Sequence, residues 1–259
     1  TGKTVTGFGT LVVSGNVDAG ASIDLTKVTA DVSFKNGNEI ANAISLSGAD
    51  STLVVTANQA SWKTVSGLGT LVIRGDVTND DLDLSDVTSA VSFQDVGEST
   101  ATIAVASNRT LYINAAQASG KTITGAGTVV VYGDVGDGTD LSHVSTNIDL
   151  SRTNTLDLST TLLPTWTAGQ TLTLGADQAD GALLNAGLGS VVVNNLDWLD
   201  NDATASLAGI TAAHVTAYVG WDTTFTGNLG NAAVVIWDSV LTLDGAMANG
   251  QIGRASCRE

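Results

Sequence analysis

Acidic side chains gather in several predicted turns, where their carboxylate oxygens could bind calcium. The densest segment holds Asp134, Asp137 and Asp140, spaced by three residues. Calcium prefers hard oxygen ligands such as carboxylates and backbone carbonyls. These three residues are therefore the first candidates for a calcium site. Two further acidic clusters could bind calcium in the same way: Asn79, Asp80, Asp81 and Asp83, and Asp197, Asp200 and Asp202.

The spacing of these carboxylates matches neither of the calcium-binding loops that have a fixed pattern. The EF-hand spacing is absent, and so is the GGxGxD nonapeptide of calcium-binding β-rolls. In the first repeat the equivalent turn, 18–22, carries the single carboxylate of Asp18. A calcium site would thus not be a fixed part of the repeat. We favour acidic turns that solvate the surface and expect no cofactor, with calcium as the alternative.

Catalytic chemistry has less support than calcium binding. A polysaccharide hydrolase needs two carboxylates at a set distance, and the many Asp residues allow such a pair. A lyase would also need cations to hold an acidic sugar, but Lys3, Lys63 and Lys121 share one repeat position, which indicates an architectural role. His214 has no neighbouring Cys or His to complete a zinc site, and His143 occupies a repeat position that tolerates other residue types. We expect no enzyme, with a β-helical polysaccharide lyase or hydrolase as the catalytic alternative.

Two other residue types could contact a ligand. Gln59, Gln117 and Gln178 recur at one repeat position. They could form a polar binding face, or else a stacked amide ladder or a corner hydrogen bond, and we favour the structural role. The Trp residues occupy different repeat positions, so they could be exposed to carbohydrate or buried in the core: Trp62, Trp166, Trp198, Trp221 and Trp237.

An internal repeat must position all of these residues. Residues 3–17 read KTVTGFGTLVVSGNV, 63–77 read KTVSGLGTLVIRGDV and 121–135 read KTITGAGTVVVYGDV. Two other blocks, DLTKVTADVSF at 24–34 and LVVTANQA at 53–60, return in the same order. We therefore predict one continuous array over residues 1–251, built from units of about 60 residues. The predicted units are about 1–60, 61–119, 120–180 and 181–251.

The repeated blocks have the character of β-strands. Runs such as Thr-Leu-Val-Val disfavour helix and suit a pleated surface, while Gly67 and Gly69 could supply positive φ or a close backbone approach at a corner. Stacked coils need no linkers, and the blocks follow one another directly, with Pro164 as the only Pro. We predict an all-β, right-handed parallel β-solenoid of about 8–12 coils. Tandem β-sandwich modules are the alternative.

The composition restricts the partners. The formal net charge is −16, with 10 Lys and Arg against 26 Asp and Glu. Such a surface repels nucleic acid and anionic lipid, because contacts to phosphates need cations. No apolar run approaches the roughly 20 residues that span a bilayer. We therefore expect no nucleic-acid partner and no membrane span in this segment.

Both ends of the sequence suggest a fragment. Thr1 lies inside a repeat, so we expect the true N-terminus, with any targeting signal that it carries, to lie outside this sequence. The last octapeptide, IGRASCRE at 252–259, holds the only Cys, Cys257, and matches nothing upstream. It can be encoded by DNA that resembles a short-read sequencing adapter. We therefore predict that residues 252–259 are a non-native, adapter-derived tail.

The repeated blocks KTVxGxG, DLSxVT and LxLxAxQA resemble the repeat regions of large bacterial surface proteins, including giant adhesins and autotransporter-type passenger regions. The resemblance covers residues 1–251. It implies an extracellular or cell-surface protein with a non-catalytic, structural or adhesive role. The partners expected from it are cell-surface glycans or neighbouring repeats of the same protein. A carbohydrate- or calcium-binding module within such a protein is the alternative function.

Overall fold

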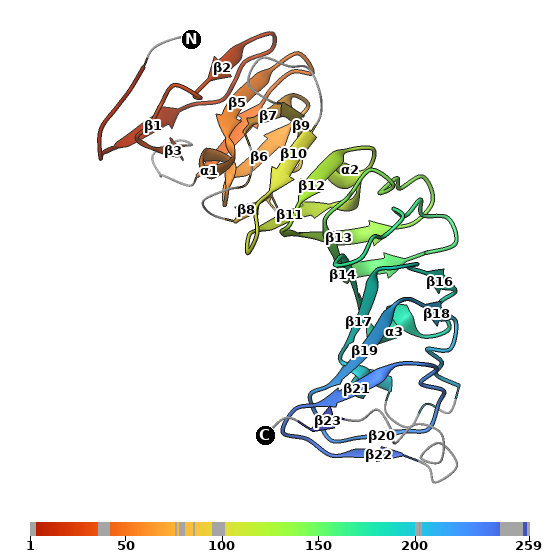
Figure 1. Cartoon of the computed structure of the whole chain (residues 1–259). Coiled ribbons are helices and arrows are strands. Elements are labelled where there is room, and N and C mark those ends of the chain that lie inside the picture. Colours follow the sequence, from red (N-terminus) through yellow and green to blue (C-terminus); the bar gives the residue numbers. More distant parts are fainter. Residues whose placement is uncertain are drawn as a thin grey trace. The chain divides into compact units, whose positions relative to one another are not determined.

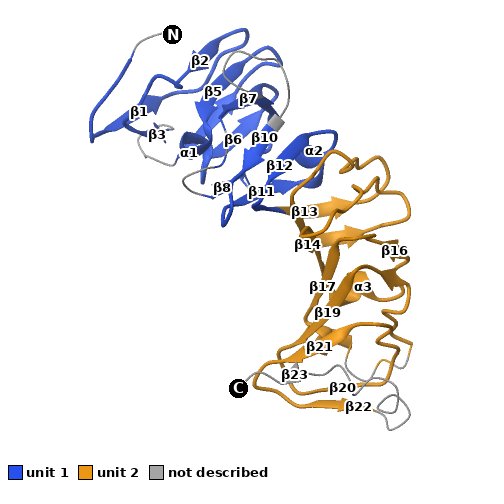
Figure 2. Cartoon of the chain, viewed as in Figure 1, with its two compact units in different colours: residues 1–129 blue, residues 130–259 orange. Residues whose placement is uncertain are grey.

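The chain is an all-β protein built as a β-solenoid. A computed structural model describes residues 4–35, 42–75, 77, 81–84, 86–94, 102–199, 202, 204–243 and 256–257. These residues form about 11 turns of mostly parallel strands with few helices. The predicted β-solenoid is therefore confirmed, and the alternative of tandem sandwiches is not observed. The chain divides into two compact units, residues 1–129 and 130–259 (Figure 2).

The strands of unit 1 pair across successive turns of the solenoid. One sheet has the order β2 (Ser22–Asp24), β5 (Thr52–Thr56), β7 (Thr70–Arg74) and β9 (Ala90–Gln94). The remaining pairs are β1 (Thr10–Ser14) with β3 (Asp31–Lys35), β4 (Ala43–Leu46) with β6 (Thr64–Gly67), β8 (Leu82–Asp83) with β11 (Thr110–Asn114), and β10 (Thr102–Val105) with β12 (Thr122–Gly125). All of these pairs are parallel (Figure 1).

Unit 2 is organised around one longer run of parallel strands. Its order is β14 (Asn147–Leu156), β15 (Thr171–Gly175), β17 (Ser190–Asn194), β19 (His214–Val219), β21 (Ala233–Ile236) and β23 (Ser256–Cys257). Two shorter pairs are β16 (Leu184–Asn185) with β18 (Ile210–Thr211), and β20 (Thr223–Phe225) with β22 (Leu241–Leu243). The boundary between the units falls within β13 (Thr128–Val135).

The core consists of aliphatic side chains stacked in register from turn to turn. In unit 1, Leu53 of β5 lies beside Leu71 of β7, and both are fully buried. In unit 2, Leu172 and Val191 pair in the same way on β15 and β17. In strands such as β15 alternate residues point inward, so one side chain in two contributes to this core. In β5 and β7 three consecutive residues are buried, because both faces of these strands are covered. Val, Leu and Ile residues make up most of these stacks.

Each copy of the LVVTANQA block forms a strand followed by a one-turn helix. The helices are α1 (Ala57–Ala60), α2 (Ala115–Ala118) and α3 (Ala176–Ala179), and they follow β5, β11 and β15. A 3₁₀ turn, η1 (Leu196–Leu199), follows β17. The helices are short because a single turn is enough to change the direction of the chain at a corner. Repeated sequence blocks therefore occupy repeated places in the solenoid.

The GxG motif also marks a corner, as predicted. Gly67 has φ +104° and Gly125 has φ +111°, a region that favours glycine. A Cβ on Gly67 would overlap the backbone carbonyl of Leu46 in the preceding turn, and one on Gly125 would overlap that of Val105. Both expected roles, positive φ and close backbone approach, thus apply at these positions.

The tail contains one short strand. Ser256 and Cys257 of β23 pair in parallel with Val235 and Ile236 of β21. The other residues from 244 to the end lie outside the described part of the chain. Pairing at a strand edge needs only backbone groups, so it is compatible with a foreign sequence. The adapter origin of residues 252–259 stays a prediction.

Candidate functional site

The repeated Gln residues are hydrogen-bonded corner residues. The Oε1 atom of Gln59 accepts a hydrogen bond from the backbone N–H of Thr56 (2.9 Å), which closes a capping box at the start of α1. Its Nε2 atom donates to the carbonyl oxygens of Leu25 (3.0 Å) and Val28 (2.8 Å), more than thirty residues earlier in the chain. Gln59 therefore ties one turn of the solenoid to another.

The other two copies repeat this arrangement with different partners. Gln117 accepts from the N–H of Asn114 (2.9 Å) and donates to the carbonyl of Val87 (2.9 Å). Gln178 accepts from Gly175 (2.7 Å) and donates to the hydroxyl of Thr153 (2.7 Å). The amides of Gln59 and Gln117 are buried. Of the two roles that the sequence allowed, the structural one is confirmed.

Two of the three calcium candidates of the 134–140 turn accept hydrogen bonds from different side chains. Asp134 is exposed and accepts a hydrogen bond from the Thr155 hydroxyl (2.9 Å). Asp140 accepts from both the backbone N–H and the hydroxyl of Ser142 (2.9 and 2.6 Å). These hydrogen bonds hold the pKa of Asp140 below its ordinary value, because they stabilise the charged carboxylate. Asp137 is exposed between them.

Residues of the other acidic clusters likewise accept hydrogen bonds or lie outside the described residues. Asp81 accepts from the N–H of Thr110 (2.8 Å), and Asp202 accepts from the N–H and hydroxyl of Thr204 (2.8 and 2.7 Å). Asn79, Asp80 and Asp200 belong to the part of the chain that is not described. Within the described ranges, no group of three or more His, Cys, Asp or Glu side chains is placed to hold a metal ion.

This geometry leads to an expected result for calcium. We expect the melting temperature of the chain to be the same in millimolar calcium and in EDTA, because a ligand raises stability only where the folded state binds it. Differential scanning calorimetry checks this expectation. A rise in calcium that disappears in Asp137→Asn, but persists in the control Asp177→Asn, would contradict it and locate a site in the 134–140 turn.

Lys63 fits an architectural role in unit 1. Its Nζ atom donates to Oδ1 of Asn42 (3.3 Å), and partial burial lowers the pKa of the ammonium group. It also lines a hollow of about 450 Å³ together with Asp31, Asn58 and Gln59. Lys3, at the same repeat position, lies outside the described residues. Gln59 lines this hollow and also forms the corner hydrogen bonds, so we assign the polar groups of the hollow a structural role.

The Trp residues divide into one buried and four exposed side chains. Trp166 is buried, with 3% of its surface exposed. Trp62, Trp198, Trp221 and Trp237 each expose about two thirds of their surface or more. Trp62 has φ +60°, at the repeat position where Gly120 and Gly181 take similar values. The question that the sequence left open is thus answered in favour of solvent exposure for most of them.

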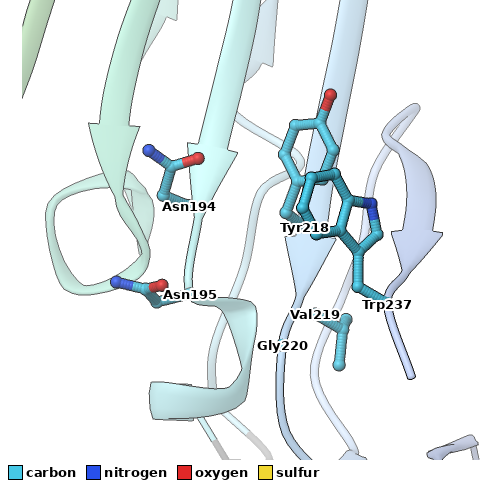
Figure 3. A pocket seen from close by; sticks show the side chains of 6 residues that line it. All are labelled: Asn194, Asn195, Tyr218, Val219, Gly220 and Trp237. Carbon is cyan, nitrogen blue, oxygen red and sulfur yellow. The ribbon is translucent and has the colours of Figure 1, made fainter. Parts of the chain in front are cut away.

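The exposed Trp237 forms one wall of a pocket in unit 2. The pocket has a volume of about 330 Å³ and is lined by Asn194, Asn195, Tyr218, Val219, Gly220 and Trp237. Figure 3 shows the two Asn side chains at the end of β17, with the rings of Tyr218 and Trp237 across from them. The two rings lie 6.0 Å apart between centroids and meet edge to face, at 84°.

Backbone hydrogen bonds between successive turns hold these walls in place. The backbone N–H of Trp237 donates to the carbonyl of Val219 (3.0 Å). This bond holds the backbone of Trp237 beside the end of β19. The N–H of Gly220 donates to Oδ1 of Asp197 in η1 (3.1 Å). This second bond joins the segments that carry the exposed Trp198 and Trp221. The pocket is thus supported by three successive turns.

The pocket combines aromatic surface with amide hydrogen-bonding groups. Tyr218 and Trp237 present apolar ring surface, while Asn194 and Asn195 each offer both donors and an acceptor. Its volume is at the lower end of the roughly 300–1,000 Å³ typical of small-molecule sites. Sequence reasoning named Trp237 as a candidate but missed Asn194, Asn195 and Tyr218. Asn194 and Asn195 lie at the end of β17, Tyr218 lies in β19 and Trp237 follows β21, so the four residues come from three turns.

Comparison with known proteins gives this chain no relative: no protein family, curated protein or solved structure matches it. Among the described residues, no helix has the length and apolar character needed to cross a membrane. The geometry of the pocket and the solenoid is therefore the basis for assigning a function.

Proposed function

We propose that this chain is a non-catalytic, structural and adhesive segment of an extracellular bacterial surface protein, and that its Tyr218–Trp237 pocket binds a glycan. The resemblance of the repeated blocks to adhesin-type repeats supports the cell-surface part of the proposal. The solenoid supports the structural part, because stacked turns present a side-chain surface without needing linkers. The pocket supports the adhesive part.

The observation that carries the glycan assignment is a pocket that combines the exposed ring of Trp237 and the half-buried ring of Tyr218 with two amides. The faces of sugar rings carry C–H groups that pack on aromatic side chains, while their hydroxyls need donors and acceptors around the rim. Tyr218 and Trp237 supply the first kind of contact, and Asn194 and Asn195 supply the second. Tyr and Trp are also the side chains that most often dominate binding energy at interfaces.

Other polar side chains that the sequence suggested as ligand contacts already form hydrogen bonds within the protein. The repeated Gln amides form hydrogen bonds at the corners, and Asp140 accepts a hydrogen bond from the hydroxyl of Ser142. The proposed glycan site uses none of these side chains. The net charge of −16 disfavours nucleic acid as a partner, since phosphate contacts need Lys and Arg.

A binding measurement on the full chain tests the proposal. We expect at least one member of a panel of neutral tetrasaccharides, built from glucose, mannose, galactose or N-acetylglucosamine, to bind in isothermal titration calorimetry. Trp237→Ala should weaken that binding by at least about ten-fold, since truncating a central aromatic contact costs more than about 1 kcal/mol. Its melting temperature should change little because Trp237 is 67% exposed.

Trp62→Ala is the matched control. Trp62 is exposed to a similar extent, 69%, but belongs to unit 1 and does not line the pocket. We expect it to bind the same tetrasaccharide as tightly as the unaltered chain does. Failure of every tetrasaccharide to bind, or equal binding by Trp237→Ala and the unaltered chain, would contradict the glycan assignment.

A further inference from the structure

The acidic surroundings of the Tyr218–Trp237 pocket bear on which glycans it accepts. The carboxylate of Asp197 accepts the hydrogen bond from Gly220, a residue that lines the pocket (3.1 Å). Asp238 directly follows Trp237, and Asp222 lies two residues after Gly220. Both are exposed, and Oδ1 of Asp222 accepts a hydrogen bond from the N–H of Val240 (2.7 Å). Three carboxylates are therefore attached to the turns that build the pocket.

Few cations are available in this unit to offset these charges. Between residues 130 and 251 the sequence has thirteen Asp, no Glu, no Lys and a single Arg, Arg152, which gives a formal charge of −12. Arg152 lies on β14 and is not among the residues that line the pocket. The field at the pocket is thus negative, and nothing in the pocket lining reverses it.

We propose, on the basis of the proposed glycan-binding function, that this pocket selects uncharged glycans and rejects anionic ones such as uronate-containing chains. Recognition of an acidic sugar needs a cation, preferably the planar guanidinium group of Arg, to pair with the carboxylate. The pocket offers two neutral amides instead. A ligand carboxylate would enter a site surrounded by like charges, at distances within about one Debye length, roughly 10 Å at 0.1 M salt.

The test compares one glycan in two charge states. The neutral tetrasaccharide that binds most tightly in the panel is oxidised at C6, so that primary alcohols become carboxylates while the ring and linkages stay the same. Both forms are titrated into the full chain in EDTA, at low and at high salt. We expect the oxidised form to bind at least about ten-fold more weakly at low salt, with the difference shrinking as salt screens the charges.

Two variants test whether the carboxylates of Asp222 and Asp238 cause this difference in affinity. Asp222→Asn combined with Asp238→Asn should bring the affinities of the two forms closer together. Asp177→Asn, which removes one charge from α3 in the same unit but outside the pocket, should leave their ratio unchanged. Asp197 is left intact because its carboxylate holds Gly220.

The possible failures are distinguishable. Equal or tighter binding of the oxidised form would overturn the selectivity while leaving glycan binding in place. A difference that salt does not reduce would overturn its electrostatic cause. Binding of neither form would overturn the proposed function, and this inference with it. A difference unaffected by the double substitution would also overturn the role of Asp222 and Asp238.

Discussion

Gly67→Ala is expected to destabilise unit 1 by about 4 kcal/mol, the largest effect of any single substitution that we predict. Two costs combine. The backbone at φ +104° is strained for any residue with a Cβ, by about 1–3 kcal/mol. The new methyl group would also overlap the carbonyl of Leu46, and overpacking of this kind costs a further 1–3 kcal/mol or so. Denaturant unfolding followed by circular dichroism measures the loss.

Gly75→Ala separates the two costs. Gly75 has a similar φ, +87°, but a Cβ there would meet no heavy atom within 4 Å. We expect this control to lose only the backbone part, about 1–2 kcal/mol. If the two substitutions proved equally damaging, the close approach between the turns at Gly67 would be refuted.

Gln59→Ala is expected to reduce the free energy of unfolding by about 2–4 kcal/mol. In a buried corner, the substitution would remove the side-chain partner of the Thr56 N–H and of the Val28 carbonyl. It would also remove one of two donors to the Leu25 carbonyl, which keeps the N–H of Val28. Each buried polar group left without a partner costs about 1–3 kcal/mol, although water entering the space recovers part of that. Thermal unfolding, converted to free energies, provides the measurement.

Two comparisons sharpen this prediction. Gln59→Glu keeps the shape of the side chain and an acceptor for Thr56, but it places a carboxylate oxygen against two carbonyls, so we expect at least the same loss. Gln170→Ala is the control, and we expect it to lose less stability. The amide oxygen of Gln170 accepts exposed hydrogen bonds from the N–H and the hydroxyl of the nearby Thr167 (2.6 and 2.9 Å), so these bonds join no separate turns. An unaltered stability in Gln59→Ala would show that the corner bonds do not hold the turns together.

The fold could be predicted because its determinants are repeated. Each turn must present an inward apolar residue at the same place as its neighbour, so selection for stacking leaves a visible period in the sequence. Leu53 and Leu71, which pair across β5 and β7, belong to two such repeated blocks. The handedness of the coils and the sorting of the chain into units could not be derived in the same way, because the periodic pattern carries no information about either.

The role of the repeated Gln could have been predicted more firmly. The segments 56–59 and 114–117 begin with Thr and Asn and end with Gln, which matches the capping-box pattern at a helix start. That signal was hidden by the shortness of the helices, since one turn has no amphipathic period. The long-range half of the interaction, from Gln59 to Leu25 and Val28, depends on which turn lies beneath and needed the structure.

The binding pocket could not be predicted, for a related reason. Asn194, Tyr218 and Trp237 lie on consecutive turns, separated by about twenty residues, and none of them recurs in another unit. Only the strand register, which brings β17 beside β19 and β19 beside β21, makes them neighbours. In contrast, Asp134 and Asp140 are close in sequence but accept hydrogen bonds from different partners, Thr155 and Ser142. The calcium candidates of this turn stay a prediction.

The most direct test of the glycan assignment is an NMR titration of the isotopically labelled full chain with the tightest-binding neutral tetrasaccharide. We expect shift changes to concentrate at Asn194, Asn195, Val219, Gly220 and the indole N–H of Trp237, while the indole of Trp62 and the side-chain amide of Gln59 stay unchanged. Changes centred on the 134–140 turn or on the Gln59 corner, or no changes at saturating ligand, would contradict this assignment.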